Sequence, residues 1–299
     1  VITDTAGNAY VTGHFESTDA MVNGDTLPNA GSYDVFTAKF SPAGKVLWVR
    51  VKGGEGYDYG HGIAIDSKGH VVITGAIGRQ VFCTKYDAEG REVWHRTTSG
   101  TVSGSGHGIA VDAQDHIYIG GNSTGSGAFG KAVIDSKTTA ALAVKLTPDG
   151  EGVWASVIPG TPSALYHEIA CDSQGRVWGA GMFKGSVSVA GETFQSSGEK
   201  DNDGLIVHLD AAAAGVGDAA VRQRDVSIQV VEQHAAATAA DQAIVVDDES
   251  RVVGIKTVVA RIGNRTAERG HRAERRVNAI AAARDLGLTQ IDQPAGRHY

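Results

Sequence analysis

Short apolar runs alternate with turn residues along the first two thirds of the chain. In the clearest stretch the runs are rich in β-branched residues and cover Gly62–Ile65, Val71–Thr74, Val81–Tyr86 and Glu92–His95. Short runs of this kind, bounded by Gly, Asp or Ser, predict β-strands. The first two are joined by Asp-x-x-Gly-x and the last two by x-x-x-Gly-x, which are sequences typical of tight hairpin turns. The pattern therefore predicts two successive hairpins.

The same pattern occurs four times. Aligned on one aspartate, the copies read "VITDTAGNAYVTG", "AIDSKGHVVITG", "AVDAQDHIYIGG" and "ACDSQGRVWGAG", at Asp4, Asp66, Asp112 and Asp172. In a second series a lysine precedes a tryptophan by nine residues, in the pairs Lys39–Trp48, Lys85–Trp94 and Lys145–Trp154. The fourth copy, "LIVHLDAAAAGVGDA", lacks the tryptophan, and we expect it to lose its fourth strand. Constant offsets within copies and variable spacing between them indicate one repeated structural unit.

Each copy predicts a four-stranded antiparallel unit that buries its faces against neighbouring copies. We expect residues 1–210 to be all-β and to form about four propeller blades. Since propellers usually close with about 4–8 blades, we interpret these four as an arc of a larger propeller. A β-sandwich is the alternative, but sandwiches do not repeat at blade length. We expect the four Asp turns along one edge and no helix longer than two turns within this span.

The repeat resembles the SBBP family of bacterial β-propeller repeats. The residues that carry the resemblance are "DTAGNAYVTG" (Asp4–Gly13), "DVFTAKFSPAGKVLW" (Asp34–Trp48) and "GIAIDSKG" (Gly62–Gly69), and it covers about residues 1–210. It implies a propeller fold and an exported bacterial protein, extracellular or at the cell surface. It implies no defined catalytic site, because the residues shared by the family are turn and packing residues.

Residues 211–299 depart from the pattern, and we expect them not to form a blade. They contain no Asp-x-x-Gly turn and no Phe, Trp or Tyr before Tyr299. Three alternatives remain: a small α/β domain, a disordered or poorly packed tail, and a reading-frame shift in a GC-rich gene, which we favour. In the first, "AIVVDDESRVVGIKTVVARIG" forms a hairpin and "NRTAERGHRAERRVNAIAAARDLG" contributes helix.

Charge, hydrophobicity and cysteine content exclude several classes of protein. The chain has 299 residues, and its formal net charge of -7 leaves no basic footprint for nucleic acid. No apolar run approaches the ~20 residues of a membrane-spanning helix. Cys83 and Cys171 fall in the second and fourth copies, too far apart to form a disulfide. The opening "VITD" reads like the end of a strand, so we expect further blades outside this chain.

Several recurring residues carry candidate chemistry. His61, His107 and His167 each precede the aligned aspartate by five residues and could together ligate a metal. In "HGIAI", however, the histidine shares a strand face with packing isoleucines, so we prefer rim packing and predict no metal and no cofactor. The lysines are expected to free their heads to solvent and the tryptophans to pack between blades. "EKDNDG" (Glu199–Gly204) has oxygen ligands for Ca²⁺, but a solvated loop is preferred.

These features predict a non-enzymatic binding or scaffold module with no catalytic residues. Its ligand would be a protein or a glycan on the loop-bearing rim, near the loops His14–Tyr33 and Phe183–Asp203. The candidate binding residues are Tyr57, Tyr59, His61, His107, Tyr166 and His167. Two alternatives are a propeller hydrolase or lyase with a site at the channel mouth, and a purely structural repeat of a large surface protein.

Overall fold

The computed structural model describes residues 1–172, 175–189, 192–198 and 202–209, together with three strands farther along the chain. These residues form strands and no helix, so the described part is all-β, and it offers no helix that could cross a lipid bilayer. The strands are β1 (Ile2–Thr3), β2 (Ala9–Phe15), β3 (Met21–Val22), β4 (Asp25–Thr26), β5 (Asp34–Phe40), β6 (Val46–Lys52), β7 (Tyr59–Ile65), β8 (Val71–Ile77), β9 (Gln80–Tyr86), β10 (Glu92–Thr97), β11 (Ser103–Val111), β12 (Ile117–Phe129), β13 (Ala132–Leu146), β14 (Gly152–Cys171), β15 (Val177–Val189), β16 (Glu192–Gln195), β17 (Asn202–Leu209), β18 (Val226–Val231), β19 (Ala243–Val246) and β20 (Val252–Lys256).

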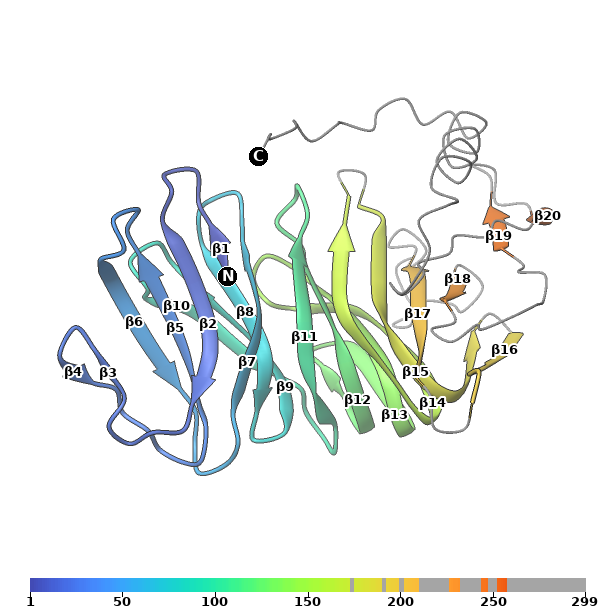
Figure 1. Ribbon diagram of the computed structural model, residues 1–299, viewed down its shortest axis with the longest axis horizontal. Coiled ribbons are helices and arrows are strands. Elements are labelled where there is room, and N and C mark those ends of the chain that lie inside the picture. Colours follow the sequence, from blue (N-terminus) through green and yellow to red (C-terminus); the bar gives the residue numbers. More distant parts are fainter. Residues whose placement is uncertain are drawn as a thin grey trace, which may run out of the picture.

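The sequence copies correspond to antiparallel units with one strand order. Unit 1 is the sheet β1-β2-β5-β6, and unit 2 is the sheet β7-β8-β9-β10. The four runs predicted in unit 2 are all strands, each one to three residues longer than expected. Figure 1 shows β2, β7, β11 and β14 following one another across the molecule in chain order. The prediction of antiparallel units without helices is therefore confirmed for the described residues.

Units 3 and 4 share one continuous sheet, which the sequence did not predict. Strand β14 is 20 residues long. Its first part pairs with β13 as the last strand of unit 3, and from Gly160 onward it pairs with β15 as the first strand of unit 4. Unit 4 continues through β17 to β18, whose residues lie beyond position 210. The expectation that the fourth copy loses its fourth strand is therefore wrong, because a strand from farther along the chain takes that place.

The aspartate turns lie along one edge of the row of units. In Figure 1 the turns β1–β2, β7–β8 and β11–β12 are at the upper edge, where β14 also ends. In unit 2 the Asp66 carboxylate accepts hydrogen bonds from the backbone N–H groups of Lys68 and His70 at 2.9 and 2.8 Å, which closes the turn. Adjacent turns also touch, since Ser67 donates through N and Oγ to the Asp115 carboxylate, both at 2.8 Å. The predicted common edge is confirmed for these turns.

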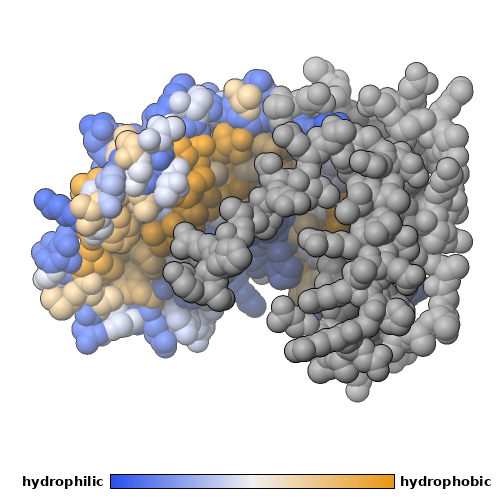
Figure 2. All heavy atoms as spheres, turned by 45° about the horizontal axis from the view of Figure 1, so that its top comes forward, coloured by the Kyte–Doolittle hydropathy of each residue, from blue (hydrophilic) through white to orange (hydrophobic). Residues whose placement is uncertain are grey.

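Three apolar cores lie between consecutive units. The first joins Tyr10, Val35 and Trp48 of unit 1 to Val71, Ile73, Phe82 and Tyr86 of unit 2, and the other two join unit 2 to unit 3 and unit 3 to unit 4 in the same way. Figure 2 shows the hydrophobic residues gathered in a band bordered by hydrophilic residues. Units 2 and 3 therefore bury their two faces against different neighbours, which explains why both faces of their strands are apolar. Cys83 and Cys171 are free cysteines.

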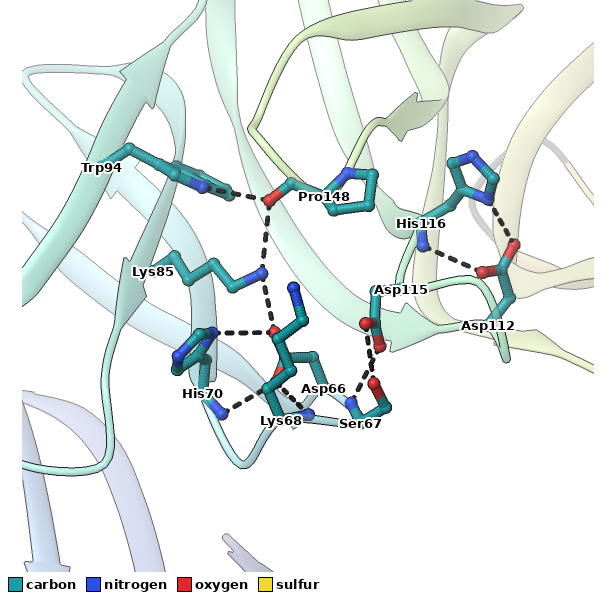
Figure 3. A network of polar contacts seen from close by, with 10 residues as sticks. All are labelled: Asp66, Ser67, Lys68, His70, Lys85, Trp94, Asp112, Asp115, His116 and Pro148. Atoms are coloured by element: carbon teal, nitrogen blue, oxygen red, sulfur yellow. Dashed lines mark hydrogen bonds and ion pairs between the residues drawn. The ribbon is translucent and has the colours of Figure 1, made fainter.

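A lysine and a tryptophan of one unit bind the same carbonyl group of the next unit. Lys85 Nζ and Trp94 Nε1 both donate to the Pro148 carbonyl, each at 3.2 Å (Figure 3). Lys39 Nζ and Trp48 Nε1 do the same at the Ala88 carbonyl, at 3.2 and 3.1 Å. The predicted packing of tryptophan between units is confirmed, and the constant spacing of lysine and tryptophan follows from their shared acceptor.

The lysine heads are not left in solvent, so that expectation is corrected. Lys85 Nζ lies 2.7 Å from Asp66 Oδ2, and the two side chains are only 5% and 1% exposed. Burial alone would raise the pKa of Asp66, but the Lys85 ammonium and the amide of His70 hold it below its usual value. The lysine thus links the aspartate turn of its own unit to the next unit.

The next unit receives the tryptophan ring on a turn glycine. A Cβ on Gly90 would lie 2.7 Å from the Trp48 ring, and one on Gly150 would lie 3.0 Å from the Trp94 ring. Both glycines also have positive φ, +76° and +81°. Glycine is required here for the turn and for the indole that lies on it.

Beyond β17, the structure describes only three strands. Strand β19 pairs with β20 in an antiparallel hairpin, within the segment where the small-domain alternative expected one. The alternatives of a disordered tail and of a frame shift, and the helix expected near residues 264–286, concern residues outside the described part. Three residues of the acidic stretch, 199–201, also lie outside it, whereas Asp203 is buried and accepts hydrogen bonds from Ser197 N and Oγ at 2.6 and 2.9 Å.

Candidate functional site

The three histidines of the repeat share one structural position, the extra residue of a β-bulge. Gly60 and Gly62 oppose Gly75 and Thr74, which are adjacent, so His61 has no partner across the sheet. The same shift leaves His107 and His167 unpaired in units 3 and 4. A bulge bends the strand and re-aims the side chain of the extra residue. The bulge occurs at the same offset in these three units, so no insertion in the sequence marks it and the strand pattern did not predict it.

Glycines beside these histidines allow the first strands of neighbouring units to approach closely. A Cβ on Gly62 would lie 2.9 Å from the His107 carbonyl oxygen, and one on Gly108 would lie 2.7 Å from the Glu168 Cα. These contacts explain why the sequence Gly-His-Gly occurs twice. In unit 4 the flanking residues are Tyr166 and Glu168 instead.

The bulged histidines belong to a continuous row of aromatic rings, called the ring row below. Its members are Tyr57, Tyr33, Tyr59, His14, His61, His107 and His167, from all four units. Tyr57 and Tyr59 are stacked at 6.5 Å and 12°, and Tyr59 and His61 at 5.9 Å and 8°. The centroids of His61 and His107 are 5.1 Å apart, and those of His107 and His167 are 6.1 Å apart. Of the predicted residues, the structure brings together five: Tyr57, Tyr59, His61, His107 and His167.

Tyr166 does not belong to the ring row, and its assignment to the binding surface is corrected. Its side chain is fully buried in the core between units 3 and 4. The neighbouring His167 is exposed, because it is the extra residue of the bulge and is re-aimed away from the core that holds Tyr166. The sequence did not single out His14 and Tyr33, the other two members of the ring row, although they are the first and last residues of the predicted loop His14–Tyr33. The two long loops hold β3–β4 and β16, which lie at opposite ends of the row of units (Figure 1).

The histidines at the centre of the ring row favour the neutral form. Partial burial against neighbouring rings, together with the nearby His107 and His14, lowers the pKa of His61 to about 4. Burial also lowers the pKa of His107, whose Nε2 donates to Asn122 Oδ1 at 3.0 Å. Among the described residues, no three His, Cys, Asp or Glu side chains come close enough to hold a metal ion. The two histidines at the centre of the ring row, His61 and His107, are therefore uncharged at neutral pH.

Replacing His107 with glutamine is expected to raise the pKa of His61, because the variant removes a neighbouring imidazolium as the pH falls. In the folded wild-type protein His61 is neutral down to about pH 4, whereas an unfolded histidine gains its proton near pH 6.5. Folding stability from this group is thus complete above about pH 6.5 and falls as the pH is lowered toward 4. NMR titration of the His61 ring checks both statements. A His61 pKa at or above 6.5 in the wild type would contradict them.

Comparison with known proteins assigns no family. No family model matches the chain, and no curated protein matches it. Among solved structures, the chain is similar to a protein of unknown function from Bacteroides caccae, with 9% identity over 69% of this chain and 71% of that chain and a TM-score of 0.35. A TM-score this low supports no argument about fold or function. The resemblance to SBBP repeats therefore stays a prediction.

Proposed function

We propose that the four units are an arc of propeller blades in a non-enzymatic binding module. The support for the arc is the contact between the first strands β7, β11 and the second part of β14, together with one apolar core between each pair of neighbouring units. Inner strands of adjacent blades meet in this way around a propeller axis. The export to a bacterial surface that the SBBP resemblance implies belongs to the same proposal.

The observation that carries the binding function is the ring row. Tyr57 is 58% exposed, and it is stacked with Tyr59, which is stacked in turn with His61. Tyrosine and histidine rings combine apolar bodies with polar edges, and a row of them suits an extended ligand. Tyrosines supply such contact area with little loss of conformational entropy. We favour a glycan as the ligand, since the C–H face of a sugar ring packs well against an exposed aromatic side chain such as Tyr57; a protein segment is the second candidate.

We expect Tyr57→Ala to weaken glycan binding by at least about tenfold, which corresponds to about 1.4 kcal/mol. The test is a glycan array with the wild-type protein, followed by calorimetric titration of the best oligosaccharide with each variant. Val133→Ala is the matched control, because Val133 is 54% exposed and its strand, β13, carries no member of the ring row. Equal affinities of Tyr57→Ala and wild type, or an array without any binding, would reject the glycan proposal. Conversion of the bound oligosaccharide to a product would support the hydrolase or lyase alternative instead.

A further inference from the structure

Units 2, 3 and 4 each have one sheet face that packs against the tryptophan-bearing face of the unit before it. In units 2 to 4 the residues of this receiving face are almost completely buried: Ile73, Phe82 and Tyr86 in unit 2, Ile119, Leu142 and Leu146 in unit 3, and Leu205 and Leu209 in unit 4 are between 0% and 3% exposed. Their contacts come from the preceding unit in each case. The receiving face is thus a repeated half of one interface.

Unit 1 has the same face, and no described residue packs on it as a preceding unit would. Strand pairing places Val11, Ala38 and Val49 in one row and Phe36 and Val51 in the next, on the side opposite Tyr10 and Trp48. Val11, Phe36, Phe40, Val49 and Val51 are only half-buried. An apolar sheet face of this kind is typical of a protein interface.

Unit 1 also has a turn, at Pro42 and Gly44, that corresponds to the tryptophan-binding turns of units 2 and 3 and that no described tryptophan contacts. Gly44 occupies the turn position of Gly90 and Gly150 and has the same positive φ, +77°, but no atom lies within 4 Å of a Cβ built on it. The carbonyl of Pro42 occupies the position of the Ala88 and Pro148 acceptors, and no described residue donates to it. The turn is therefore shaped like those that hold an indole and an ammonium in units 2 and 3.

We infer that the face of unit 1 binds a further repeat unit that carries an intact Lys–Trp pair. The incoming indole would lie on Gly44, and the incoming indole N–H and ammonium would both donate to the Pro42 carbonyl. The two interfaces already present in this chain specify this occupant, because they make these contacts at equivalent residues. Unit 4 of a second copy is a poorer match, since Gly217 stands where the tryptophan belongs. The inference deepens the proposed propeller arc and does not depend on the ring row.

A fusion protein tests whether the face of unit 1 binds a further unit. A second copy of residues 57–108, which contains Lys85 and Trp94, is placed directly before Val1 of the full chain. This junction restores the register of the first strand, because Val1 aligns with Ile109. Hydrogen exchange of the amides in residues 34–52 should slow by at least about tenfold in the fusion compared with the original chain. The same fusion with Trp94→Ala in the added copy should lose most of this gain.

Gly44→Ala distinguishes contact with the incoming indole from backbone strain in the turn. In the original chain the new methyl group adds only strain at positive φ. In the fusion it also collides with the incoming indole, so the loss of protection from hydrogen exchange should be larger there. Gly69→Ala is the matched control, because Gly69 has φ +78° and no atom within 4 Å of its Cβ position, and its cost should be the same in both proteins. No gain of protection in the fusion, an equal gain with Trp94→Ala, or equal effects of Gly44→Ala in both proteins would overturn the inference. Glycan titration of the original chain reports on the ring row separately.

Discussion

Replacing Lys85 with methionine is expected to lower the free energy of unfolding by about 3–5 kcal/mol, because the change removes the ammonium that faces the buried Asp66 carboxylate and leaves it only the contacts of Lys68 and His70. The ion pair measures 2.7 Å between Lys85 Nζ and Asp66 Oδ2, and both side chains are almost fully buried. Methionine keeps much of the length and the apolar stem of lysine, so the loss reports mainly on the charge. Urea denaturation followed by circular dichroism measures the effect.

Lys145→Met is the matched control for this prediction. Lys145 is the equivalent residue of unit 3, and its Nζ lies 5.1 Å from the centroid of the Tyr118 ring, without a carboxylate at ion-pair distance among the described residues. Its replacement should therefore cost clearly less. Equal losses for the two variants would contradict a special role of the Asp66–Lys85 pair.

The pH dependence gives a second check on Lys85→Met. Because the pKa of Asp66 is lowered in the folded protein, the stability that this group contributes is present above the unfolded value of about 3.9 and is lost as the pH falls through the folded pKa. The difference between wild type and variant should thus be large at neutral pH and shrink below about pH 4. A difference that is the same at both pH values would argue for lost packing instead of lost charge.

Trp94→Ala is expected to destabilise the interface between units 2 and 3 by about 3–5 kcal/mol, the usual range for removing a buried tryptophan. The Trp94 ring is 8% exposed, lies on Gly150 and donates to the Pro148 carbonyl (Figure 3). The variant removes the packing and the hydrogen bond together. Because stability in repeat arrays depends on contacts between neighbours, hydrogen exchange should increase most on both sides of this interface.

Trp178→Ala is the control with the same chemical change. Trp178 is 44% exposed, so its replacement creates no closed cavity and should have a much smaller effect on unfolding. A loss for Trp178→Ala as large as that for Trp94→Ala would show that burial between units is not the source of the stability.

The sequence by itself determined the repeated unit, its strands and its turns. These features depend on local chemistry: β-branched runs form strands, and Asp66 and Gly69 close a turn through contacts within a few residues. The role of Trp48 and Trp94 was also predictable, because a large apolar residue at a constant position in every unit is expected at a repeated interface. His61, His107 and His167 could be placed in one register for the same reason.

Only the tertiary structure decided which side chains form the ring row. The bulge at His61 is set by how β7 pairs with β8, and the approach of the next unit depends on Gly62 meeting the backbone of β11. Tyr166 shows the limit most clearly, since it is adjacent to an exposed histidine in sequence but belongs to a core between two units. The sharing of β14 by two sheets and the addition of β18 are likewise contacts between distant segments. Local patterns do not encode such contacts, because they depend on where separate strands meet in space.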